Sequence, residues 1–175
     1  MPEGFETPEH PLEPELLPVS LTLSILAVLV AGVTLLGHRT HTEELLLQAR
    51  ATDQWAFYQA KNIRRHNYEM FSDLLSVVKG ENAGQVSTLR EKYKKELERY
   101  AKDKEEIQSE ARALEKERDV QRKKADRFDA GEGLLEIALV ITSITLLTRR
   151  RMFWHVGMLV ALGGVSVALT AFWIH

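Results

Sequence analysis

An uncharged stretch of 21 residues near the N-terminus, Leu16 to Leu36, sets the strongest limit on the fold of this chain. As an α-helix rising about 1.5 Å per residue, it is long enough to cross the roughly 30 Å hydrocarbon core of a bilayer. We therefore predict a transmembrane helix at residues 16–37. A cleaved signal peptide is the alternative, but no Lys or Arg precedes the stretch and no small-residue cleavage pattern follows it. We favour a retained anchor.

Two further apolar stretches predict transmembrane helices at residues 131–148 and 152–174. The former carries Glu132 and Glu136 one turn apart near its start, where a carboxylate requires headgroups, protein or water around it. The latter has Phe and Trp pairs at both ends, as expected of interfacial aromatic residues. Small residues on one of its faces predict close packing against another span or a neighbouring copy. These are Gly157, Ala161, Gly164, Ala168 and Ala171.

The region between the first two spans, residues 38–130, is rich in charge and has a heptad pattern that predicts two helical arms around a turn near residues 79–84. A short turn folds such arms into an antiparallel coiled-coil hairpin. In the first arm the predicted seam is Leu46, Ala49, Asp53, Ala56, Ala60, Ile63, Asn67, Met70, Leu74 and Val77. In the second it is Tyr93, Leu97, Tyr100, Lys104, Ile107, Ala111, Leu114, Arg118, Gln121, Ala125 and Phe128.

The first arm has a second apolar stripe, formed by Leu47, Ala51, Trp55 and Tyr58. We expect it to lie on the face turned away from the seam, where exposed aromatic side chains require a cover. The sequence therefore predicts this stripe as an interaction surface, covered by another copy in a homo-oligomer or by a separate, unidentified protein. The mixed charges of the arms do not indicate a nucleic-acid site.

The remaining composition limits the chemistry. Residues 1–15 contain four prolines and five glutamates without Lys or Arg, which predicts a disordered acidic tail. The chain has no cysteine, no phosphate-binding loop and no nucleophile motif, so we expect no enzyme activity and no cofactor. His38, His41 and Glu44 share a helical face, but no further ligands complete a coordination shell, and we predict no metal site.

Two segments resemble a family of bacterial membrane proteins defined only as a domain of unknown function. They are DQWAFYQAK at residues 53–61 and KADRFDAGEGLLEIALVI at residues 124–141. The resemblance implies a bacterial inner-membrane protein with three spans, a helical hairpin and no established activity. It adds the following residues to Trp55, Tyr58, Glu132 and Glu136 as motif positions: Asp53, Gln54, Gln59, Lys61, Arg127, Phe128 and Gly131.

Taken together, these features predict an all-α membrane protein with three transmembrane helices and a long hairpin between the first and second. Arg149, Arg150 and Arg151 lie in the shortest loop and favour a cytoplasmic position for it, which places the tail inside and the hairpin on the outer, periplasmic side. We expect a structural or interaction protein that self-associates in the lipid bilayer. The alternative is a channel or transporter component in which Glu136, with Thr142 and Thr145, lines a polar path.

Overall fold

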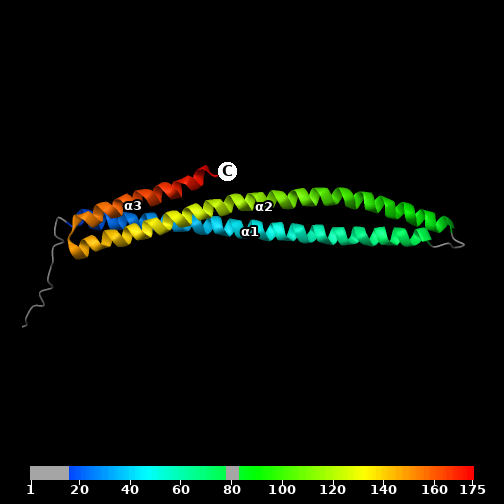
Figure 1. The fold of residues 1–175 in the computed structure, drawn as a ribbon, viewed down its shortest axis with the longest axis horizontal. Coiled ribbons are helices and arrows are strands. Elements are labelled where there is room, and N and C mark those ends of the chain that lie inside the picture. Colours follow the sequence, from blue (N-terminus) through cyan, green and yellow to red (C-terminus); the bar gives the residue numbers. More distant parts are fainter. Residues whose placement is uncertain (1–15, 78–82) are drawn as a thin grey trace, which may run out of the picture. The chain divides into compact units, whose positions relative to one another are not determined.

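The computed structural model describes residues 16–77 and 83–175, and its elements are all helices. Helix α1 spans Leu17–Val77, α2 spans Ala83–Thr148, and α3 spans Arg151–Thr170, followed by a short 3-10 helix, η1, at Ala171–Trp173 (Figure 1). The predicted all-α class is thus confirmed. The acidic tail predicted at residues 1–15 and most of the turn predicted at 79–84 lie outside the described residues.

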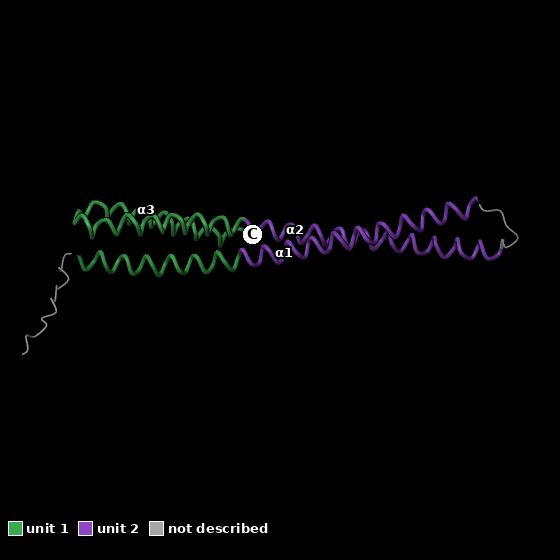
Figure 2. Tube along the Cα trace, turned by 90° about the horizontal axis from the view of Figure 1, so that it is seen from below, with its two compact units in different colours: residues 1–40, 123–175 green, residues 41–122 purple. Residues whose placement is uncertain are grey.

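The chain divides into two compact units, coloured separately in Figure 2. Unit 1 contains residues 1–40 and 123–175, and unit 2 contains residues 41–122. Helices α1 and α2 contribute to both units, whereas α3 belongs to unit 1 alone. All three helices contain a segment long and apolar enough to cross a membrane.

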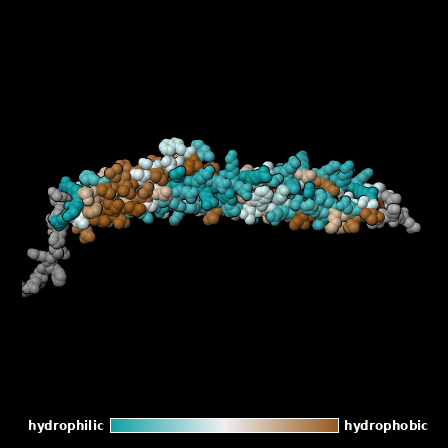
Figure 3. Space-filling model, in the orientation of Figure 1, coloured by the Kyte–Doolittle hydropathy of each residue, from teal (hydrophilic) through white to brown (hydrophobic). Residues whose placement is uncertain are grey.

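Unit 1 is a three-helix packing in which small residues lie inside. All five small residues predicted to share a face of α3 and η1 are buried. Against them lie Leu135 and Ala138 of α2 and Leu26 of α1, each less than 5% exposed. Without large side chains between them, α2 and α3 approach closely, as helices in membrane proteins commonly do. Figure 3 shows the hydrophobic side chains gathered on the outside of this unit.

Helices α2 and α3 approach closely at Gly131. A Cβ atom placed there would lie 2.8 Å from the Cβ of Ala168 and 3.0 Å from the carbonyl oxygen of Gly164. Real Cβ atoms avoid such distances, so only glycine fits without moving a helix. At Gly133, two residues further along α2, an added Cβ would meet nothing within 4 Å.

The link between α2 and α3 is short and depends on a left-handed backbone conformation. Arg149 has φ 56°, and its N–H donates to the carbonyl oxygen of Thr145 at 2.8 Å. A residue in this conformation just after a helix satisfies one of the unpaired terminal carbonyls and reverses the chain direction. Arg150 then adopts an extended conformation before α3 begins.

Unit 2 is an antiparallel pair of arms from α1 and α2, which lie side by side (Figures 1 and 2). The seam prediction for the second arm is confirmed, because all eleven predicted side chains are buried or half-buried. The most enclosed of them in unit 2 are Tyr100, Ile107 and Ala111, at 5%, 6% and 0% exposure.

The seam prediction for the first arm is wrong, because all ten predicted side chains are exposed. The side chains that face inward are instead Leu47, Ala51, Gln54, Trp55, Tyr58, Lys61, Asn62, Arg65, Tyr68, Glu69, Ser72 and Leu75. Two stripes of helical spacing compete on this arm, and the one with Trp and Tyr offers far more apolar area, roughly 150–250 Å² per aromatic side chain. Three of the predicted stripe's ten residues are alanines, Ala49, Ala56 and Ala60, whose small side chains offer less apolar area.

The contrast between Gly131 and Gly133 gives a matched test of packing in unit 1. We expect Gly131→Ala to destabilise the packing of α2 and α3 by about 1–3 kcal/mol, because the added methyl group has no room. Gly133→Ala should leave stability unchanged or raise it by up to about 1 kcal/mol, since alanine favours a helix. The difference is measured by denaturing both variants in detergent while monitoring the helical circular dichroism signal. Equal stabilities of the two variants would contradict the close approach of α2 and α3.

Candidate functional site

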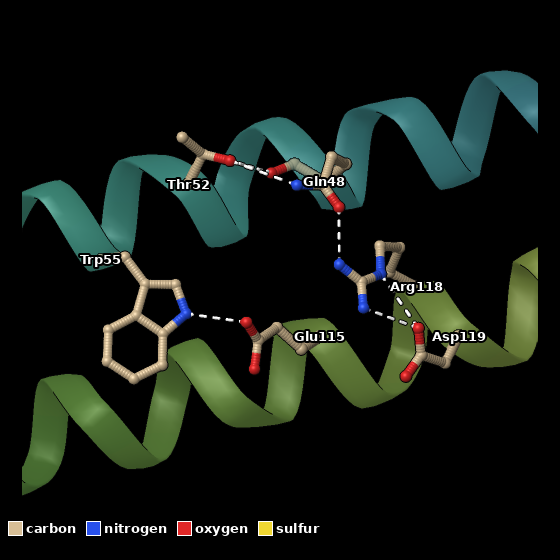
Figure 4. A network of polar contacts seen from close by, with 6 residues as sticks. All are labelled: Gln48, Thr52, Trp55, Glu115, Arg118 and Asp119. Carbon is tan, nitrogen blue, oxygen red and sulfur yellow. Dashed lines mark hydrogen bonds and ion pairs between the residues drawn. The ribbon is translucent and has the colours of Figure 1, made fainter.

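The most elaborate set of side-chain contacts in the described residues joins the two arms of unit 2. We call it the cross-arm network; on α1 it contains Gln48, Gln54, Trp55, Tyr58 and Lys61, and on α2 Asp103, Lys104, Glu110, Glu115 and Arg118. Both sets point into the space between the helices, as Figure 4 shows for part of the network.

Trp55 and Arg118 make the contacts between the two helices that Figure 4 draws. The indole Nε1–H of Trp55 donates to Oε1 of Glu115 at 2.9 Å, and Nη1 of Arg118 donates to Oε1 of Gln48 at 2.6 Å. Asp119 accepts a second bond from the same guanidinium at 2.6 Å and fixes its orientation. Hydrogen bonds to charged groups are stronger than neutral ones, so these pairs hold the arms in a defined relation.

Lys61 is enclosed by aromatic rings and one carboxylate. Its Nζ lies 2.8 Å from Oδ2 of Asp103, 5.4 Å from the ring centre of Phe57 and 5.1 Å from that of Tyr100. Such placement combines an ion pair with attraction between the cation and the ring faces. A second cation–ring contact has the lysine on α2 and the ring on α1: Nζ of Lys104 lies 5.3 Å from the ring centre of Tyr58.

The hydrogen bond from Lys61 lowers the pKa of Asp103 below its ordinary value of 3.8. Coulombic attraction to Lys61, Arg99 and Lys102 acts in the same direction, whereas partial burial opposes it. A carboxyl group with a lowered pKa in the folded state binds its proton less readily there than in the unfolded chain. Its stabilising contribution is therefore present above the ordinary pKa and is lost as the pH falls through the lowered one.

The network sets the register of the arms. Gln48 pairs with Arg118, Gln54 with Glu110 at 2.5 Å, and Lys61 with Asp103, so the partners run in opposite order along the two helices. A shift of one arm by a single turn would separate every one of these pairs. Polar groups at a helix interface commonly specify register in this way.

The structure corrects the predicted interaction surface on the first arm. Leu47 and Ala51 are only 3% and 1% exposed, and Trp55 and Tyr58 are half-buried with their polar contacts directed to α2. This stripe is the inner face of the hairpin, so it is already covered within the chain. The prediction is wrong because the heptad stripe that it assigns to the seam lies on the opposite, exposed side of α1.

The first motif, residues 53–61, is mostly accounted for by the hairpin. Gln54, Trp55, Tyr58 and Lys61 all contact α2 through the network. Asp53 and Gln59 are exposed and point elsewhere.

The second motif lies in unit 1 and mostly serves packing. Phe128 is buried, with its ring centre 5.9 Å from that of Phe172, and Gly131 forms the close contact described above. Glu132 is half-buried and accepts a hydrogen bond from the Thr34 hydroxyl at 2.6 Å, which joins α1 to α2. Arg127 borders an open hollow of about 310 Å³ with Lys123, Asp126, Ala130 and Ile174.

Glu136 is exposed on the outer face of α2, whereas Thr142 and Thr145 are buried at 0% and 1% exposure. A Cβ atom on Gly157 of α3 would collide with the Thr142 hydroxyl, so that threonine is enclosed by α3. The three residues predicted to line a polar path are therefore not brought together within one chain.

Within residues 16–77 and 83–175, no group of three His, Asp or Glu side chains is arranged to hold a metal ion. His41 lies 3.5 Å from Glu44, an ordinary contact one helical turn apart. The cross-arm network also pairs its carboxylates with amide, indole and ammonium groups, so its polar atoms are occupied in holding the arms together.

A family model described as "Domain of unknown function (DUF4337)" matches residues 16–174. The chain belongs to this family. The match includes both motifs and all four helical elements of this DUF4337 chain. Comparisons with curated proteins and with solved structures gave no match. The description of the family assigns it no activity.

Glu110 and Glu115 are network residues that the sequence pattern does not single out. They flank the seam residues Ala111 and Leu114. Positions beside a heptad seam commonly hold the charged groups that pair two helices. Their partners, Gln54 and Trp55, lie on the face of α1 that the heptad pattern predicts to point away from α2.

Removing the indole N–H donor of Trp55 tests the cross-arm network. Trp55→Phe keeps an aromatic ring in place and leaves Glu115 without its bond, so we expect a loss of about 1 kcal/mol. In a chain of this size, that loss lowers the melting temperature by about 2–4 °C. Gln59→Ala, on the exposed face of the same helix, is the control and should change the melting temperature little; an unaltered Trp55→Phe melting curve would contradict the assignment.

The Lys61–Asp103 pair predicts a pH-dependent stability difference. At neutral pH the parent protein should be more stable than Lys61→Met, because the ion pair is formed only in the parent. The difference should shrink as the pH falls below 3.8 and Asp103 is protonated. Melting temperatures of both proteins measured between pH 7 and acidic pH test this, and a difference independent of pH would show that the ion pair is not responsible.

Proposed function

We propose that this protein is a membrane-anchored interaction protein of the bacterial inner membrane that projects its helical hairpin from the bilayer and self-associates. One observation supports membrane anchoring above the others: unit 1 encloses small residues and exposes large apolar ones. Val28, Leu147 and Leu159, one from each helix, are 72%, 87% and 71% exposed. In water this surface would promote aggregation, whereas lipid chains cover it without cost.

The orientation follows from charge. The link between α2 and α3 contains Arg149 and Arg150, with Arg151 beginning α3, and short basic loops remain on the cytoplasmic side. With the link inside, the hairpin and the C-terminus are outside. Lys123, Lys124 and Arg127 flank the second span on the hairpin side and favour the opposite orientation, but long connections are translocated largely regardless of charge.

The polar contacts between the two arms of unit 2 support a role in interaction. The polar atoms between the arms are engaged in the cross-arm network, and they hold the arms in one register. The hairpin thereby becomes a defined surface on which another protein or another copy can dock. Nothing in this arrangement calls for a cofactor.

A channel or transporter component is the second proposal, carried by the exposed carboxylate of Glu136. A charge at this position on a membrane span requires water, headgroups or another protein chain around it. A polar path would therefore run between copies, without Thr142 and Thr145. Ion flux in reconstituted vesicles that is lost in Glu136→Gln would support this role, whereas absence of flux in the parent protein would exclude it.

Orientation can be measured because the chain contains no cysteine. We expect a Cys at Ser109, on the exposed face of α2 in unit 2, to react with an impermeant maleimide added to the outside of cells. A Cys at Thr148 should react only after the membrane is permeabilised. The reverse pattern would place the hairpin in the cytoplasm, and extraction of the protein from membranes by alkaline carbonate would contradict membrane anchoring.

A further inference from the structure

A complete heptad stripe on α1 lies outside the hairpin and is exposed along its whole length. We call it the outer stripe: Leu46, Ala49, Asp53, Ala56, Ala60, Ile63, Asn67, Met70, Leu74 and Val77. Its large apolar members are well exposed, with Ile63 at 61%, Met70 at 55%, Leu74 at 56% and Val77 at 78%. Figure 3 shows separate hydrophobic patches along the α1 side of unit 2.

The spacing of the outer stripe identifies the kind of surface it is. Its residues alternate at three and four positions from Leu46 to Val77, so in one heptad register they occupy every a and d position. In the same register the residues that face α2 fall at b, c and f, for example Leu47, Trp55 and Tyr58. Helix α1 thus has two opposite faces, and α2 covers only one of them. A sustained a and d repeat matches the knobs and holes of another helix.

We propose that a second copy of this chain covers the outer stripe, with the α1 helices of the two copies forming a parallel two-stranded coiled coil. The proposal rests on the proposed function, because two copies anchored by α1 in one bilayer present these helices in the same direction. A heptad stripe is self-complementary in that arrangement, since each a or d layer meets its own equivalent.

The size of the stripe is sufficient for a specific contact. Residues 46–77 as a helix are about 48 Å long and about 10 Å wide, so the stripe covers roughly 500 Å² on each copy. Two such faces bury about 1,000 Å², the size at which specific protein interfaces begin. Anchoring in one membrane raises the effective concentration of the copies further.

The residues beside the stripe are compatible with this pairing. In a parallel pair, each g position lies near the following e position of the other helix, which brings together Leu45 with Arg50, Thr52 with Phe57, Gln59 with Arg64, and His66 with Phe71. No pair joins two carboxylates or two basic groups of fixed charge. An arrangement of this kind has no repulsive contact along its edges.

Two polar residues occupy a positions and have opposite effects. Asn67 can bond to its equivalent, and a single Asn at an a position favours two strands in register. Asp53 would face a second Asp53 between the small residues Ala49 and Ala56, where water can reach both carboxylates. The parallel pair is therefore weaker at this layer than it would be with a neutral side chain.

The first experiment breaks the stripe in the full-length protein held in lipid bilayers at several protein-to-lipid ratios. The double variant Ile63→Lys, Leu74→Lys should raise the dimer dissociation constant by roughly a hundredfold or more, because both copies lose apolar contacts. Both positions are exposed within one chain, so helical circular dichroism should remain as in the parent. A control variant with Lys at Ser109, on α2, should dimerise like the parent.

The second experiment strengthens the contact between two outer stripes and tests whether the two α1 helices run parallel. Asp53→Asn removes the facing charges and should lower the dissociation constant by about fivefold. A single Cys at Met70, a d position, should form a disulfide between copies under mild oxidation, and a single Cys at Ser109 should not. In an antiparallel pair centred on the stripe, Met70 would lie opposite Asp53, about 25 Å from its own equivalent, and no Met70→Cys disulfide would form.

The outcomes separate this inference from the proposed function. A dimer that is insensitive to the lysine substitutions, is not strengthened by Asp53→Asn, or is not linked through Met70→Cys would overturn the outer stripe as the parallel contact. Self-association would then be mediated by another surface of the protein. A parent protein that is monomeric at every density in bilayers would overturn both the outer stripe and self-association.

Discussion

The competition between two faces of α1 for one partner helix determines the organisation of unit 2. Helix α2 can cover only one of them, and it covers the face with Trp55, Tyr58 and Tyr68. That choice is favoured by area, because aromatic side chains bury more apolar surface than the alanines of the outer stripe. It is also favoured by charge, because Trp55 and Lys61 find carboxylates at matching positions of α2. The outer stripe remains exposed as a consequence.

Unit 1 follows the opposite packing rule. Its helices meet through Gly131, Gly157, Gly164 and neighbouring alanines, while large apolar side chains point outward. In water the hydrophobic effect would drive those side chains inward, but in a lipid environment close van der Waals contact between backbones becomes the main attraction between helices. In unit 2, aromatic and ionic contacts hold α1 and α2 together, whereas in unit 1 small residues let α2 and α3 approach closely.

The structure also separates two roles for acidic residues that look alike in the sequence. Glu132 and Glu136 are one turn apart, yet Glu132 accepts a hydrogen bond from Thr34 of α1, whereas Glu136 lies on the outer face. Glu136 comes four residues after Glu132, which is slightly more than one helical turn. Its side chain is therefore rotated past the contact between α1 and α2. A carboxylate inside a contact stabilises the fold, and one outside it remains available to water, lipid headgroups or another chain.

Helix content, the buried face of α3 and the seam of α2 were all determined by the sequence alone. In each of these helices one periodic stripe differs clearly from the polar or large residues on the other faces. Burial of that stripe is therefore much more favourable than burial of any other face. The inner face of α1 was not determined in this way, because two stripes of helical spacing lie on opposite sides of the same helix. Periodicity identifies both stripes but does not rank them. Only the tertiary structure decided between them, since the ranking depends on how much area and how many charged partners α2 offers to each face.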